Sequence, residues 1–74
     1  MSGAEVKARK MIAGLSLQSL VEQFELTDVI EDENISTVRG WLMDELEKRD
    51  PDAFSKWIED YADSPRVYFL REEV

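Results

Sequence analysis

The chain has 74 residues, contains neither cysteine nor histidine, and carries a formal net charge of -8 from 9 basic and 17 acidic residues. A chain of this length forms a single domain and buries only about 60% of its unfolded surface, so a well-packed helical core or a partner subunit must support it. The composition excludes disulfides and metal sites built from thiolates or imidazoles. The acidic balance disfavours direct binding to nucleic acid or to an anionic membrane.

The sequence also lacks the patterns of a membrane span and of a secretion signal. The segment MSGAEVKARKMIAGL places basic residues before a short apolar run, whereas a signal peptide needs a longer apolar core and a cleavage site. No run approaches the roughly 18 apolar residues of a transmembrane helix. We therefore expect a cytoplasmic protein with no membrane partner.

The first two elements expected along the chain are helices. Residues 1–14 mix apolar and basic side chains and predict a helix that frays at the terminus and is interrupted by Gly14. A clearer helix is predicted over 17–26, where Ser16 is a plausible N-cap. Its apolar residues recur at i, i+3, i+4 and i+7, namely Leu17, Leu20, Val21 and Phe24.

Residues 22–33 are the most acidic part of the chain and include no Lys or Arg. Such a run is usually a solvated helix face followed by a polar loop. The alternative is an anionic surface for a basic partner, for which Glu31, Asp32 and Glu33 are the candidate residues. A calcium-binding loop does not fit, because a loop starting at Asp28 has Ile30 at its third position and no glycine at its sixth.

The third helix is predicted at about 36–49, with Ser36 as its cap and an apolar face at positions 38, 41, 42 and 46. Acid-first i, i+4 pairs join Asp44 to Lys48 and Glu45 to Arg49 and favour a helix here. Gly40 lies inside this helix, where glycine costs about 1 kcal/mol relative to alanine. We interpret it as the site of a close helix contact, within one chain or between two.

Asp50-Pro51 predicts a junction between two helices, because proline suits a first helical position and disfavours helical geometry in the residue before it. Asp50 should then cap a helix from 51 to about 62. The apolar face of that helix should be Phe54, Trp57, Ile58 and Tyr61, which recur at i, i+3, i+4 and i+7. Ser64-Pro65 should end it.

The remaining residues, 64–74, form a tail with the apolar run Val67, Tyr68, Phe69 and Leu70. Periodicity leaves three conformations open: a short strand, an extended arm or one last helical turn. The run either packs back on the core or docks on a partner, since exposed apolar patches mark contacts. Taken together, the elements predict an all-α fold over 1–74, a small three- to four-helix bundle with a short C-terminal extended tail.

Arg39 falls in the first turn of the third helix, where a cation opposes the helix dipole. We expect a surface pair with Glu31, Asp32 or Glu33, and the alternative is an arginine that faces a partner. No nucleophile-and-base pattern or phosphate-binding glycine motif is present, so we expect no catalytic residues, no cofactor and no metal.

The stretch that carries a family resemblance combines Val38-Arg39-Gly40-Trp41, then Met43 to Glu47, then Pro51, Phe54 and Trp57. With this VRGWLMDELEKRxPxAFxxW core, residues 16–60 resemble small acidic proteins of bacterial phages and mobile elements. The resemblance implies that the chain originates from a phage or mobile element. It also weakens the expectation that the protein is an enzyme. Because that group has no assigned activity, the resemblance implies no functional residues.

Three functional hypotheses follow. The first is a non-catalytic protein-interaction module whose protein partner could be a second copy, giving a homodimer. The second is an acidic decoy that inhibits a nucleic-acid-binding host protein, which the charge of -8 favours. The third is a nucleic-acid binder that uses Lys7, Arg9, Lys10 and Arg39, and the net charge argues against it.

Overall fold

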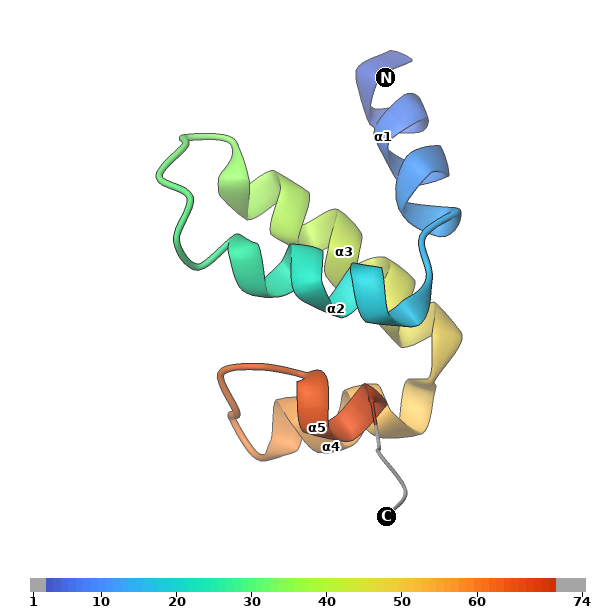
Figure 1. The fold of residues 1–74 in the computed structure, drawn as a ribbon, viewed down its shortest axis with the longest axis vertical. Coiled ribbons are helices and arrows are strands. Elements are labelled where there is room, and N and C mark those ends of the chain that lie inside the picture. The colour runs from blue at the N-terminus through green and yellow to red at the C-terminus, as the bar shows by residue number, and fades with distance from the viewer. Residues whose placement is uncertain (1–2, 71–74) are drawn as a thin grey trace.

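The computed structural model describes residues 3–70, which fold into a small all-α bundle (Figure 1). Its helices are α1 (Gly3–Ala13), α2 (Leu17–Leu26), α3 (Ile35–Arg49), α4 (Pro51–Glu59) and the short α5 (Arg66–Phe69). The predicted all-α bundle is confirmed. Residues 1–2 of the expected first helix and 71–74 of the expected tail lie outside the described residues.

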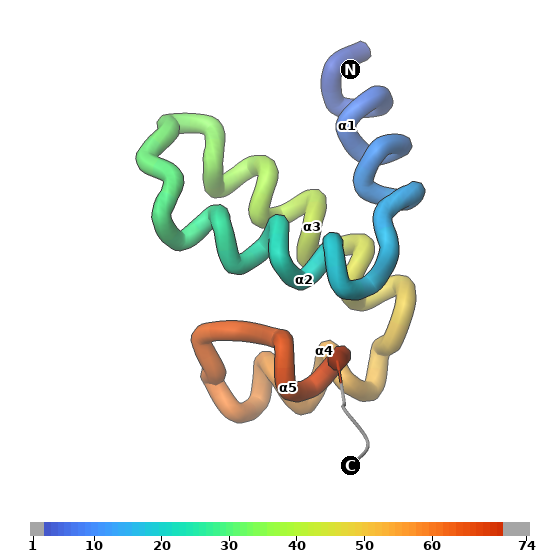
Figure 2. Tube along the Cα trace, viewed as in Figure 1, coloured from blue at the N-terminus to red at the C-terminus, as the bar shows by residue number. Residues whose placement is uncertain are grey.

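The helices are arranged as two stacked hairpins and one crossing helix. In Figure 1, α2 and α3 run antiparallel and are joined by the loop 27–34, while α4 and α5 form a second layer beneath them. The helix α1 stands across the end of the first hairpin, and the chain path is easiest to follow in Figure 2. Packing contacts join α3 to α4, α2 to α3, α4 to α5 and α1 to α3.

Local signals fix the start of α2 as predicted. The Ser16 side chain accepts a hydrogen bond from the Ser19 N–H at 3.1 Å, which satisfies one of the free donors of the first turn. The helix then buries Leu20, Val21 and Phe24. The predicted span of 17–26 and its apolar face are therefore confirmed.

The junction at Asp50-Pro51 is also confirmed. The Asp50 carboxylate accepts from the Ala53 N–H at 3.1 Å and so caps α4, while the Asp50 N–H donates to the Leu46 carbonyl and closes α3. The start of α3 differs from the expectation. Its N-cap is Asn34, which makes no side-chain cap hydrogen bond, and Ser36 lies inside the helix.

The end of α4 comes at Glu59, earlier than predicted. Tyr61 adopts a φ of 53°, in the left-handed region, and its side chain is 92% exposed. The Trp57 indole N–H donates to the Ala62 carbonyl at 2.8 Å and holds the chain as it turns back. The prediction that Tyr61 belongs to the apolar face is therefore wrong, because the helix has ended before the face reaches it.

Trp57 is the centre of the core. Its ring makes edge-to-face contacts with Phe24 at 5.1 Å, Phe54 at 5.7 Å and Phe69 at 6.5 Å between centroids. Such pairs contribute about 0.5–1.5 kcal/mol each beyond the area they bury. This cluster joins α2, α4 and α5.

The apolar run near the C-terminus adopts the helical turn among the three conformations left open by periodicity. The expectation of an extended tail is wrong for residues 66–69, which form α5. The turn is held because Phe69 packs against Trp57 and because the Tyr68 hydroxyl donates to the Asp60 carboxylate at 2.6 Å. Glu25 on α2 also pairs with Arg66 at 2.8 Å and accepts from Ser64.

Gly40 faces open space. A Cβ built on it would meet no atom within 4 Å, other than those of its neighbours and its own helix backbone. The prediction of a close helix contact within the chain is wrong, because Gly40 lies two residues from both Val38 and Leu42 and so points away from their face. The contact between two chains stays a prediction.

Within residues 3–70, none of the helices combines the length and apolar character needed to cross a membrane.

Candidate functional site: an apolar pocket between three helices

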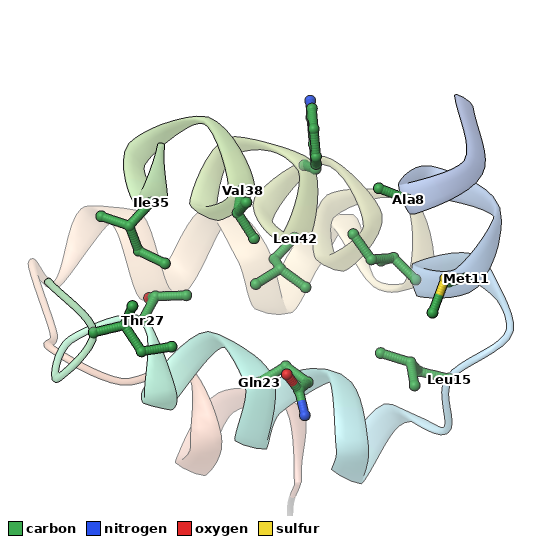
Figure 3. A pocket seen from close by; sticks show the side chains of 11 residues that line it. Ala8, Met11, Leu15, Gln23, Thr27, Ile35, Val38 and Leu42 are labelled. Carbon is green, nitrogen blue, oxygen red and sulfur yellow. The ribbon is translucent and has the colours of Figure 1, made fainter. Parts of the chain in front are cut away.

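An open, mostly apolar pocket of about 340 Å³ lies between α1, α2 and α3 (Figure 3). Its α3 side is formed by Ile35, Val38, Trp41 and Leu42, and its α1 side by Ala8, Met11, Ile12 and the following Leu15. Gln23 of α2 and Thr27 and Ile30 of the loop complete it. We call this the α1–α2–α3 pocket.

The pocket exists because α1 is fastened to α3 along one side. Ile12 is buried in the core, and the Arg9 guanidinium pairs with Asp44 of α3 at 3.1 Å. Arg49 holds the end of α1: its Nη2 donates to the carbonyls of Ile12 and Ala13 at 3.3 and 3.2 Å, which belong to the last turn and so lack an intrahelical i+4 partner. The Ile12 carbonyl also accepts from the Leu15 N–H at 3.1 Å. Ile12 and its neighbours Ala8 and Met11 line the pocket beside this contact.

Apolar side chains at the pocket remain open to solvent. Met11 is 72% exposed and Ile30 is 46% exposed, although both belong to the lining. Val29, next to Ile30 in the loop, is also exposed. Contiguous exposed apolar surface on a small protein marks an interaction site, whereas single exposed side chains do not.

The lining offers little polar chemistry. Its polar side chains are Gln23 and Thr27, and the Thr27 hydroxyl already donates to the Phe24 carbonyl and accepts from Arg39. Small-molecule sites combine an apolar wall with several convergent polar groups that orient the ligand. The pocket is therefore better suited to apolar side chains of a macromolecule than to a polar substrate.

Opposite charges flank the two sides of the pocket. Glu31, Asp32 and Glu33 are exposed in the loop that contains Ile30. Among residues 3–70 no basic side chain pairs with these three, and the Asp32 carboxylate accepts the Asn34 N–H at 2.8 Å. On the α1 side, Lys7 and Lys10 are exposed and likewise make no ion pair within the described chain.

Arg39 does not pair with Glu31, Asp32 or Glu33, and that prediction is wrong. It binds Asp28 and donates to the Thr27 hydroxyl at 2.9 Å, and its guanidinium lies 4.5 Å from the centre of the Phe24 ring. The antiparallel hairpin places Arg39 beside the end of α2 and the first two residues of the loop, rather than beside residues 31–33. Arg39 joins α2 to α3 and is not part of the pocket lining.

The candidate residues near the C-terminus lie apart from the pocket. Phe69 is buried, Tyr68 and Leu70 are half-buried, and Val67 is 72% exposed. None of the four lines the pocket. The run thus packs mainly on its own core in this structure, which leaves Val67 as its exposed member.

Sequence reasoning missed the pocket, although one signal was available. Ala4, Ala8, Met11 and Leu15 recur at i, i+4, i+7 and i+11, an apolar stripe on one side of the first helix. Ile12 lies beside this stripe and is buried. The apolar side of α1 is therefore wider than the part of it that packs against α3.

Comparison with protein-family models, curated proteins and solved structures found no match for this chain. The features that bear on function are therefore the pocket and the charges beside it.

Proposed function

We propose that this chain is a small, non-catalytic protein-interaction module that binds an amphipathic helix of a protein partner in the α1–α2–α3 pocket. The observation that carries the proposal is the exposure of Met11 and Ile30 within an apolar lining. A helix that presents apolar residues at i, i+3, i+4 and i+7 would remove these side chains from water, at about 25 cal/mol for each Å² buried.

A phage-displayed library of random peptides tests this proposal directly. Peptides of about 16 residues, roughly four helical turns, are selected on the immobilised protein and then synthesised for calorimetry. We expect selected peptides to share helical apolar spacing and to bind Met11→Glu at least about 10-fold more weakly, a loss of about 1.4 kcal/mol. Met11 is exposed, so this substitution should leave the fold intact.

Val67→Glu is the matched control, because Val67 is as exposed as Met11 but lies on α5, outside the pocket. It should bind the selected peptides as wild type does. Failure to select any peptide, or equal binding to wild type and Met11→Glu, would overturn the proposal.

A second candidate function is an acidic decoy for a nucleic-acid-binding host protein, which fits the suggested origin in a phage or mobile element. The observation that favours it is the exposed group Glu31, Asp32 and Glu33 in a chain of charge -8. Contacts of this kind weaken as salt screens them, with a Debye length of about 8 Å at physiological ionic strength.

The decoy is tested by capture from bacterial lysate at low and high salt, followed by elution with duplex DNA. The expected result is a DNA-binding protein that is retained at low salt, released by DNA and lost with E31K/D32K/E33K. If the captured proteins are retained equally at low and high salt and are not released by DNA, this function is excluded.

A further inference from the structure

We propose that the occupant of the α1–α2–α3 pocket is α1 of a second copy of this chain, so that two copies pair about a two-fold axis. The inference depends on the proposed function, because it names the partner for the same site. In such a pair, each copy places its α1 against the pocket of the other, and the same surface is used twice.

The helix α1 supplies both a wall of the pocket and an apolar ridge. Ala8 and Met11 line the pocket, and Ala4 precedes them on the same side of the helix. Met11 is 72% exposed, more than Val6, the other large apolar side chain of α1 that is exposed. A two-fold interface requires a patch that is complementary to itself, and an exposed apolar helix ridge beside an apolar pocket meets this requirement.

The charges on either side of the pocket also favour this pairing. Lys7 and Lys10 lie on α1, and Glu31, Asp32 and Glu33 lie on the loop at the other side of the pocket. Within one copy these groups do not pair with each other across residues 3–70. Placing α1 of a second copy in the pocket brings its two lysines to the acidic loop, and the two-fold axis creates this contact twice.

The net charge of -8 on each copy does not prevent such a pair. At physiological ionic strength, charges separated by more than about 8 Å are largely screened, while opposite charges in direct contact keep their attraction. An interface made by one helix of three turns is small. It falls at or below about 1,200 Å², the low end for specific complexes, so we expect dissociation in the micromolar range.

The test is sedimentation equilibrium on the whole chain with two charge-reversal variants, K7E/K10E and E31K/D32K/E33K. We expect wild type to dimerise, and each variant alone to dimerise at least about 10-fold more weakly, because like charges then face each other. Mixing the two variants should restore association. In the mixed pair, glutamates on one α1 meet lysines on the other loop, and the second contact keeps the native charges.

The mixture separates specific pairing from net charge. E31K/D32K/E33K is less negative than wild type, so general repulsion alone would make it associate more strongly, the opposite of the expected result. K48E/K56E is the matched control: it carries the same net charge as K7E/K10E but changes lysines outside the pocket lining. It should dimerise as wild type does.

A wild-type chain that stays monomeric up to about 1 mM, well above the micromolar range expected for such an interface, would overturn the dimer. A dimer indifferent to both charge reversals would also overturn it. If the peptide library still yields ligands that depend on Met11, the pocket function stands and only the identity of the partner is wrong. If the library also fails, the pocket function is wrong as well.

Discussion

At the scale of single residues, Gly40 is a helix position whose cost is not compensated within the chain. A methyl group added there would meet nothing within 4 Å other than its own helix and neighbours. We therefore predict that Gly40→Ala raises the free energy of unfolding by about 1 kcal/mol, the difference in helix propensity. Thermal unfolding at low concentration measures it, with an expected rise of roughly 4–8 °C for a chain of this size. A neutral or destabilising result would indicate that Gly40 contacts something outside the chain.

Tyr61 is the second residue where local geometry and residue type disagree. Its φ of 53° lies in the left-handed region, which costs a non-glycine residue about 1–2 kcal/mol, and its exposed ring has little contact to lose. Tyr61→Gly should therefore stabilise the protein by about 1 kcal/mol in urea unfolding. Tyr61→Ala is the control, since it removes the ring but keeps the Cβ. If the alanine variant is as stable as the glycine variant, strain at this residue is not the cause.

At the scale of elements, Glu25 fastens α5 to α2. Hydrogen bonds from Arg66 and Ser64 lower the pKa of the Glu25 carboxyl from 4.5 to about 2. Because the folded pKa is depressed, this contribution to stability is complete above pH 4.5 and is lost as the pH falls toward 2. The contact is partly exposed, so about 1 kcal/mol is the expected size at neutral pH.

Glu25→Gln should therefore have a lower free energy of unfolding than wild type at about pH 6.5 and a similar one at about pH 2. The difference between the two proteins should shrink as the pH falls between these values. Urea unfolding across this range measures the gap. Glu22→Gln serves as the control, because Glu22 lies on the same helix and makes no ion pair within residues 3–70. A gap between Glu25→Gln and wild type that stays constant with pH would show that the carboxylate charge does not hold α5.

The sequence predicted those elements whose boundaries depend on neighbouring residues. Ser16 and Asp50 bond to N–H groups three residues ahead, so the starts of α2 and α4 follow from short-range chemistry. The end of α4 did not follow. It is set by the Trp57 indole bonding to Ala62 and by the left-handed Tyr61, neither of which has a local sequence signal.

At the scale of the whole molecule, the pocket depends on how α1 leans against α3, and no local pattern specifies that angle. It is fixed by two arginines far from their partners in sequence, Arg9 to Asp44 and Arg49 to the carbonyls of Ile12 and Ala13. Arg39 illustrates the same limit. Proximity in sequence favoured Glu31, Asp32 and Glu33 as partners, whereas the antiparallel hairpin brings Arg39 to Asp28 at the start of the loop. The sequence shows which charged residues are present, but the partners of these arginines are determined by the three-dimensional fold.

The proposed dimer makes a final prediction about stability. Binding that occurs only in the folded state raises Tm with concentration, because mass action stabilises the associated form. Raising the chain concentration about 100-fold through the micromolar range should therefore raise the wild-type Tm by roughly 4 °C or more, corresponding to about 1 kcal/mol.

Differential scanning calorimetry at both concentrations measures this shift. Met11→Glu should unfold at the same temperature at each concentration, since a carboxylate would then lie in the apolar contact, while Val67→Glu should keep the shift. A wild-type Tm that does not change with concentration would mean that the small core supports the fold by itself. The exposed apolar wall of α1 would then be available for a different protein.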